Sequence, residues 1–143
     1  MMRRTLPVRA LILALLAGSP LVAAQSSSAT PDPGAAASGR GTFRTYCATC
    51  HGLEARGDGQ LAEHLKVKPA NLTEIAKRNE DGKFPFDFIV QIIDGRQKVK
   101  GHGGGEMPVW GDAFRVTESG HTEEQVQARI RNLAHFLWSI QRP

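Results

Sequence analysis

The chain has 143 residues, a length that needs only one domain. Its formal net charge of +4 includes Arg3, Arg4 and Arg9, and removing these three from the 18 basic residues leaves 15 against 14 acidic residues, or +1. A body so close to neutral lacks the basic excess of nucleic-acid-binding domains, so nucleic acid is not an expected partner.

Residues 1–24 have the pattern of an export signal. The three arginines precede an apolar run over residues 10–17, and small residues at 22–24 offer a cleavage site before Gln25. The apolar run is shorter than the about 20 residues that a membrane-spanning helix needs, although an uncleaved anchor stays open. We therefore expect a soluble protein that is exported to the periplasm and is monomeric there.

The segment after the signal changes character near residue 39. Residues 25–38 are rich in Ser, Ala, Pro and Gly, with one charge and no apolar period, which predicts a disordered tether. Residues 39–143 are then expected to form the single domain. Its first helix is predicted over residues 39–50. Tyr46 and Cys47 follow Phe43 by three and four positions, so all three lie on one face of a helix.

Cys47 and Cys50 lie three positions apart, and His51 follows directly. A Cys-X-X-Cys-His run is typical of covalent haem attachment, in which each thiol adds to one vinyl group of the porphyrin. One helical turn presents both sulfurs and the imidazole to the same face, so we expect His51 to bind the iron as the proximal ligand. The expected cofactor is one haem c, attached through Cys47 and Cys50.

Two other kinds of site also use closely spaced cysteines. A thioredoxin-like redox disulfide belongs to a βαβ pattern, and the sequence has no strand-rich run. A zinc site needs four ligands, usually as two spaced pairs, and histidines would have to complete it here because the chain has two cysteines. Both are weaker interpretations than haem attachment.

The middle of the domain reads as short helices joined by turns. Residues 60–66 are expected to form a short helix, and residues 69–72 an extended segment, because a residue before proline avoids the helical region. Thr73 is expected to cap a helix that ends near Arg78. Residues 85–94 are predicted to form an apolar helix, which the following glycine ends.

The C-terminal part holds a glycine-rich loop and a long helix. Residues 96–105 are basic and then glycine-rich, so this loop needs a partner to order it. The last helix is predicted over residues 122–141, capped by Thr122, with an apolar stripe at spacings of three and four. Since no strand is expected anywhere, the predicted fold class is all-α.

Met107 is the candidate for the second axial ligand of the iron. It is the one methionine left after removal of the signal, and Pro108 restricts it to an extended backbone. Its thioether would favour the reduced iron and raise the potential, which suits electron transfer. His102, on the same loop, is the alternative ligand. Methionine also serves as simple core filler, so the pattern alone leaves that use open.

The remaining histidines are weaker candidates for the iron. His64, His121 and His135 have no motif around them, and we expect them at the surface or on a helix face.

With these motifs the chain resembles the class I c-type cytochromes, and among them small bacterial monohaem proteins with a Met-Pro-x-Trp-Gly segment. The likeness runs from residue 39 to the C-terminus. It rests on the segments at 47–52, 69–72 and 107–111 and on the final helix. It implies a cytochrome c fold, with short helices wrapped around one covalently attached haem.

The resemblance also implies a specific crossing of the first and last helices. In this family the two helices meet near a glycine and an aromatic residue. These would be Gly39 and Phe43, with Leu133 and Phe136 as their partners on the last helix. The glycine would let the two backbones come close.

Three further haem contacts follow from the resemblance. A proline carbonyl accepts a hydrogen bond from the proximal imidazole in the family, and Pro69 matches it, although the segment from His51 is longer than in the short mitochondrial members. Leu72 would line the haem wall. Trp110 would pack near the haem edge or propionates, or serve in the core.

The expected function is one-electron transfer between redox proteins, with iron cycling between Fe(II) and Fe(III) under His51 and Met107. Filled axial sites leave no place for substrate, so we expect a carrier and not an enzyme. Donors and acceptors are expected to be redox proteins, including a membrane oxidase or dehydrogenase, docked through small interfaces. The alternatives are a peroxidase-like haem enzyme or a gas-sensing haem protein, both of which need a labile distal ligand.

Overall fold

The computed structural model describes residues 30–97, 107–117 and 121–142. The expected signal over residues 1–24, the start of the tether and His102 lie outside these described residues. The described helices are α1 (Pro33–Tyr46), α2 (Ala48–His51), α3 (Ile75–Arg78), α4 (Phe86–Asp94), α5 (Trp110–Thr117) and α6 (Glu123–Ser139), with 3₁₀ turns η1 (Ala62–His64) and η2 (Leu72–Glu74). No strand occurs among the described residues, so the predicted all-α fold class is confirmed.

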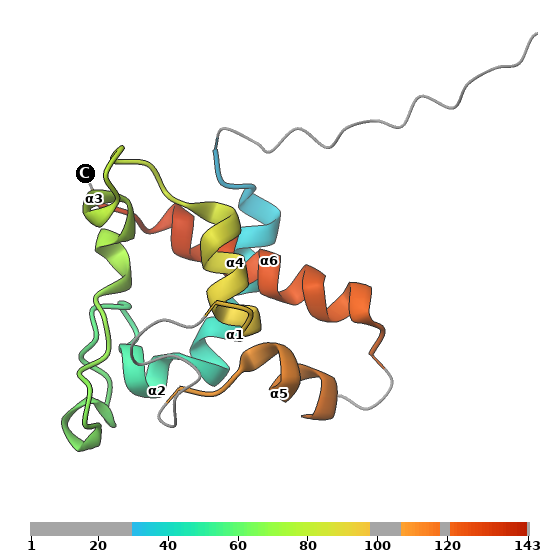
Figure 1. Cartoon of the computed structure of the whole chain (residues 1–143), viewed down its shortest axis with the longest axis horizontal. Coiled ribbons are helices and arrows are strands. Elements are labelled where there is room, and N and C mark those ends of the chain that lie inside the picture. The colour runs from blue at the N-terminus through green and yellow to red at the C-terminus, as the bar shows by residue number, and fades with distance from the viewer. Residues whose placement is uncertain (1–29, 98–106, 118–120, 143) are drawn as a thin grey trace, which may run out of the picture.

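The crossing of α1 and α6 forms the centre of the molecule (Figure 1). Gly39 on α1 lies against the backbone at Asn132 and Leu133 on α6, so close that any Cβ at Gly39 would overlap the carbonyl of Asn132. One turn later the rings of Phe43 and Phe136 pack at 5.1 Å between centroids. The helix crossing that the resemblance implied at these residues is confirmed.

The first helix begins earlier than the sequence indicated. It starts at Pro33, where a proline at the first helical position has no amide hydrogen to leave unpaired. Asp32 caps it, because its carboxylate accepts a hydrogen bond from the amide of Ala35 at 2.6 Å. The expectation of a tether up to residue 38 is therefore wrong for residues 33–38. Their small residues lacked the apolar period by which a helix is recognised.

Three further elements differ from the expectations. Thr73 was expected to be the cap, but Asn71 caps the 3₁₀ turn η2 instead. The side chain of Asn71 accepts hydrogen bonds from both the amide and the hydroxyl of Thr73. Only the 3₁₀ turn η1 forms within residues 60–66. The helix α5 was not predicted, because its single buried aromatic residue, Phe114, gives too short a pattern to establish a helical period.

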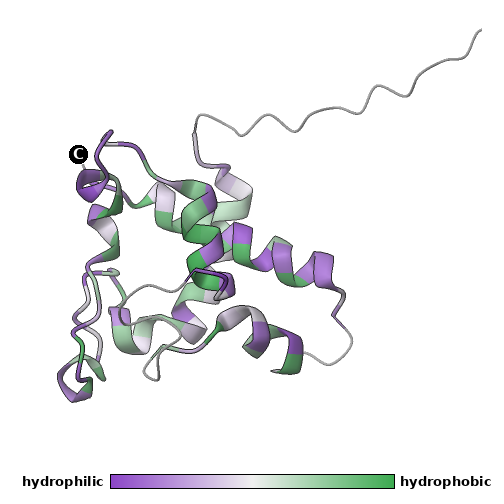
Figure 2. Cartoon of the chain, viewed as in Figure 1, coloured by the Kyte–Doolittle hydropathy of each residue, from purple (hydrophilic) through white to green (hydrophobic). Residues whose placement is uncertain are grey.

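Helix α4 covers one side of the α1–α6 pair and ends where expected. Gly95 adopts the left-handed conformation with φ of 85° and ends the helix. In Figure 2 much of α4 is apolar, whereas the N-terminal turns of α6 are mostly hydrophilic. Ile89 and Ile93 of α4 are buried, while Phe88 remains 44% exposed. The apolar face of α4 therefore has one part in the core and one part that faces an opening.

The C-terminal residues fasten the segment that contains η2 and α3. The side-chain amide of Gln141 donates a hydrogen bond to the carbonyl of Leu72 and accepts one from the amide of Ala76, each at 2.8 Å. The amide of Arg142 donates to the carbonyl of Thr73 at 2.9 Å. Among the helices that the structure describes, none is both long and apolar enough to span a bilayer.

The close approach at Gly39 gives a direct test of the fold. Gly39→Ala should lower the free energy of unfolding by about 1–3 kcal/mol, as for other overpacked contacts, because α1 and α6 must move apart. Gly41→Ala is the matched control on the same helix, with no atom within 4 Å of the added Cβ. It should instead stabilise by about 0.5–1 kcal/mol through helix propensity. Chemical denaturation followed by circular dichroism measures both, and equal effects would contradict the crossing.

Candidate functional site

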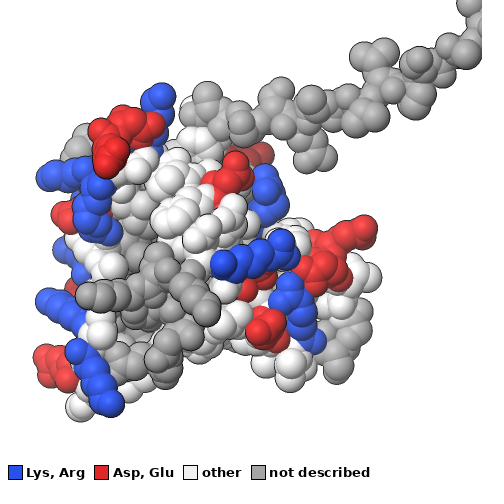
Figure 3. Space-filling model, viewed as in Figure 1, with Lys and Arg blue, Asp and Glu red and all other residues white. Residues whose placement is uncertain are grey.

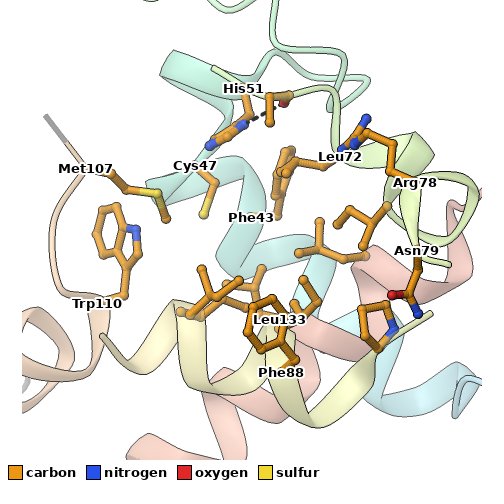
Figure 4. Close-up of a pocket in the computed structure, with 17 residues that line it drawn as sticks. Phe43, Cys47, His51, Leu72, Arg78, Asn79, Phe88, Met107, Trp110 and Leu133 are labelled. Atoms are coloured by element: carbon orange, nitrogen blue, oxygen red, sulfur yellow. Dashed lines mark hydrogen bonds between the residues drawn. The ribbon is translucent and has the colours of Figure 1, made fainter. Parts of the chain in front are cut away.

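A cavity of about 280 Å³ opens between α1, α2, α4, α6 and residues 70–79 (Figure 4). Two sulfur-bearing side chains, Cys47 and Met107, and the imidazole of His51 enter it from different segments. The remaining wall is mainly apolar, and its apolar residues are Phe43, Leu72, Ile75, Pro85, Phe88, Ile89, Ile92, Ile93, Leu133 and Leu137. A pocket with few polar groups and a large apolar wall suits a large apolar ligand.

His51, the last residue of α2, is held in one orientation. It is 7% exposed, and its Nδ1 donates a hydrogen bond to the carbonyl of Ala70 at 3.2 Å. A carbonyl only accepts, so the proton lies on Nδ1 and Nε2 is the nitrogen available to a metal ion. Burial lowers the pKa of His51, against an opposing contribution from the bond to Ala70. The neutral imidazole, which is the form that binds metals, is therefore favoured.

The acceptor for His51 differs from the expectation. Pro69 was expected to supply the carbonyl, but the carbonyl of Ala70 does so. The carbonyl of Pro69 instead lies against Gly57, which has a φ of 79° and where a Cβ would overlap the Pro69 oxygen. Because Gly57 takes the space beside the carbonyl of Pro69, the carbonyl of Ala70 is the one that faces the imidazole. Pro69 therefore belongs to the support of the site and not to its lining.

The segment that carries the Ala70 carbonyl is fixed by backbone hydrogen bonds. The amide of Leu72 donates to the carbonyl of Ala55 at 2.8 Å, and the amide of Gly57 donates to the carbonyl of His51 at 2.8 Å. The first bond joins the turn after His51 to Leu72, two residues beyond Ala70, and the second closes that turn on His51. The imidazole and its acceptor are thus placed by the same short turn.

The two cysteines have different surroundings. Cys47 lies at the junction of α1 and α2 and is buried, with its side chain in the cavity. Burial, and then the neighbouring Cys50, raises the pKa of the Cys47 thiol to about 12. Cys50 is half-buried one helical turn later, and it is not among the described residues that line the cavity. Both thiols are free, so no disulfide competes with attachment of a ligand.

Met107, Leu72 and Trp110 all line the cavity, as expected. Met107 and Trp110 lie together on one side of it in Figure 4. Trp110 packs edge to face on Tyr46, with 5.7 Å between ring centroids. The structure therefore places Met107 in the same cavity as Cys47, which lies 60 positions earlier in the sequence.

The other candidate histidines lie elsewhere. His64 and His121 are exposed. His135 is on α6, where its Nδ1 accepts a hydrogen bond from the amide of Asp32 at 3.1 Å and its ring packs on Phe86. None of these three lines the cavity that the described residues form.

The sequence reasoning missed a polar end of the cavity. Arg78 and Asn79 line it on the side away from Met107 (Figure 4). The guanidinium of Arg78 donates to the carbonyl of Asn71 at 2.7 Å and lies 3.5 Å from the carboxylate of Glu74. Nothing in the sequence separates Arg78 from the other basic residues. Arg78 lines the cavity only because the tertiary structure places the end of α3 beside the same cavity as α4.

The residues present fit a covalently held haem. The apolar wall suits a macrocycle, Cys47 offers a thiol inside the cavity, and Nε2 of His51 is left without a proton. Within the described residues no group of three or more His, Cys, Asp or Glu side chains gathers as a metal site. The zinc interpretation therefore has no structural support in that part of the chain, and the thioredoxin-like interpretation lacks the strands that it needs there.

Comparison with protein families gives one match. The model of the family Cytochrome C oxidase, cbb3-type, subunit III matches residues 34–137, which run from the start of α1 to the last turns of α6. No curated protein and no solved structure matches the chain.

The contact at Gly57 tests the support of His51. Gly57→Ala should displace the Pro69–Ala70 carbonyls and weaken the hydrogen bond to Nδ1, because the new methyl group takes their space. Gly82→Ala is the matched control, since Gly82 also has positive φ, 69°, but open space around it. The left-handed conformation should cost each variant about 1–2 kcal/mol of stability. Gly57→Ala should lose a further ~1–3 kcal/mol.

The loaded protein provides a second measurement. Loss of the bond to Nδ1 makes the imidazole less basic, so the reduction potential of Gly57→Ala should rise. The potential of Gly82→Ala should equal that of the unchanged protein. Potentiometric titration compares the three, and an equal potential in all of them would contradict the role of the Ala70 carbonyl.

Proposed function

This chain belongs to the family of cytochrome C oxidase, cbb3-type, subunit III, and we propose that it is a monohaem electron carrier of class I type with His51 and Met107 as axial ligands. The family makes it a c-type cytochrome, whose activity is haem-based electron transfer. The proposal that His51 and Met107 are the axial ligands rests on one observation: Cys47, His51 and Met107 all line one apolar cavity.

Three cavity residues and the neighbouring Cys50 would hold the haem. Cys47 and Cys50 would attach it through thioether bonds, and Nε2 of His51 and the thioether of Met107 would bind its iron. When bound, the haem supplies a centre that gains or loses one electron between Fe(III) and Fe(II). The Ala70 carbonyl orients the imidazole of His51, and the apolar wall keeps water from the centre.

The ligand pair favours electron transfer over catalysis. Methionine as second ligand raises the potential of the iron, and two strong axial ligands leave no open position for a substrate. The peroxidase-like and gas-sensing alternatives both require that Met107 leaves the iron. We propose that the protein itself is not an enzyme and acts as the electron-transfer partner or subunit of one.

The family also suggests the kind of partner. Its description names an oxidase, so we propose that a membrane oxidase is among the redox proteins that exchange electrons with this chain. Residues 1–24 support a periplasmic location, because their charge and apolar pattern is that of an export signal. The domain itself then corresponds to the helices from α1 to α6.

Replacing Met107 tests the second ligand. Met107→Ala should keep covalent haem but lose the charge-transfer band of methionine-ligated ferric haem and bind carbon monoxide readily when reduced. Its reduction potential should fall by roughly 0.1 V or more, within the about 0.8 V that axial ligands span. His64→Ala is the control, because His64 is exposed and outside the cavity. An unchanged absorption spectrum in Met107→Ala would rule out ligation by this residue.

The cysteines allow a graded test of attachment. Cys47→Ala and Cys50→Ala should each leave one thioether, and the double variant none. Extraction with acid and organic solvent should strip the haem from the double variant alone, as absorbance in the organic phase will measure. Release of the haem from the unchanged protein would disprove covalent attachment.

A further inference from the structure

Asp94, the last residue of α4, is a buried carboxylate without a role in the haem site described above. Its side chain is 3% exposed. It pairs with Arg96 just beyond α4, with Arg115 of α5 at 3.4 Å, and with the side-chain amide of Gln127 of α6 at 3.2 Å. A buried carboxylate is tolerated only where such partners replace its hydration. Asp94 therefore joins three segments that are distant in the sequence.

The partners of Asp94 are themselves held in place. Arg115 binds both carboxylate oxygens of Glu123, at the start of α6, at 2.7 Å each. This pairing lowers the pKa of Glu123 to about 2 and raises that of Arg115. Figure 3 shows the acidic and basic side chains grouped where α5 and α6 meet. The ion pairs thus connect the C-terminal end of α4 to both helices.

The backbone next to Met107 packs on this same end of α4. Gly111 lies directly on Asp94, so that a Cβ there would overlap the carboxylate oxygen Oδ1. A Cβ at Gly95 would likewise overlap a methyl group of Val109. The segment Val109–Gly111, which opens α5, is therefore seated on the residues Asp94 and Gly95.

Met107 is connected to that seat by one stiff residue. Pro108 has a fixed φ and restricts the backbone of Met107 before it. A shift of Val109 is therefore carried to Met107 with little loss. The place of the thioether in the cavity depends on how firmly the first turn of α5 is held against α4.

We propose that Asp94 is a positioning residue for Met107: its buried carboxylate clamps the start of α5 to α4 and α6 and so keeps the thioether over the cavity. The proposal rests on the proposed ligation of the iron by Met107. Asp94 touches neither the ligand nor the haem cavity, and it acts through Gly111 and Arg115. Weakening the clamp increases the fraction of molecules in which Met107 has left the iron.

An external ligand measures that fraction. Imidazole binds ferric iron only where Met107 is off, so its apparent affinity rises in proportion to the population of the open state. For the full-length, haem-loaded protein, Asp94→Asn keeps the shape of the side chain and removes its charge. Its apparent affinity for imidazole should rise about tenfold, equivalent to about 1.4 kcal/mol. The charge-transfer band of methionine-ligated haem should weaken in parallel.

Two milder variants guard against misfolding of Asp94→Asn. Arg115→Gln removes a partner that is 35% exposed, and Gly111→Ala pushes α5 from Asp94 without a change in charge. Both should raise the affinity for imidazole in the same direction. Gly82→Ala is the control for general loss of stability, because the left-handed backbone at Gly82 strains an alanine while the added Cβ meets no atom within 4 Å. Its affinity for imidazole should equal that of the unchanged protein.

The outcomes separate this proposal from the one on which it rests. Ligation by Met107 is wrong if the unchanged protein lacks the charge-transfer band, or if Met107→Ala binds imidazole no more tightly than the unchanged protein. The proposed role of Asp94 is then wrong as well. If Met107→Ala binds imidazole more tightly but the Asp94, Arg115 and Gly111 variants match Gly82→Ala, the ligation by Met107 stands and the role of Asp94 is disproved.

Discussion

The contact of α1 with α6 at Gly39 is the constraint on which the rest of the structure depends. Since a glycine lies there, the two helices approach to backbone contact, and Phe43 and Phe136 fill the next turn. Helix α1 leads directly into Cys47 and His51, while α6 supplies part of the cavity wall. The crossing therefore sets the distance between the attachment residues and the wall that they face.

The proposed ligands of the iron are supported by two separate parts of the molecule. His51 is oriented by the carbonyl of Ala70, and the turn around it is fixed by backbone hydrogen bonds from Gly57 to His51 and from Leu72 to Ala55. Met107 is held through Val109 and Gly111, which sit on the end of α4. The first support consists of backbone hydrogen bonds and the second of a buried ion-pair cluster.

Each expectation that failed has a physical cause. Ala70 and not Pro69 is the partner of His51, because the carbonyl of Pro69 lies against Gly57 on another segment, a contact that the local sequence does not reveal. The early start of α1 at Pro33 rests on a cap by Asp32, which compensates for residues without an apolar period. Helix α5 is stabilised by contacts with other helices, such as that of Phe114 with Tyr46 of α1, so its short sequence pattern was not enough to predict it.

The order of residues alone was enough to infer the fold class and to propose the chemistry of the site. The spacing of Cys47, Cys50 and His51 and the Met107-Pro108 pair are local patterns, and the absence of strands follows from the periods of the apolar residues. Only the tertiary structure decided which carbonyl orients His51, that Arg78 and Asn79 close one end of the cavity, and that Asp94 is buried among basic partners. These features depend on contacts between segments far apart in the chain, and such contacts leave no periodic mark in the order of residues.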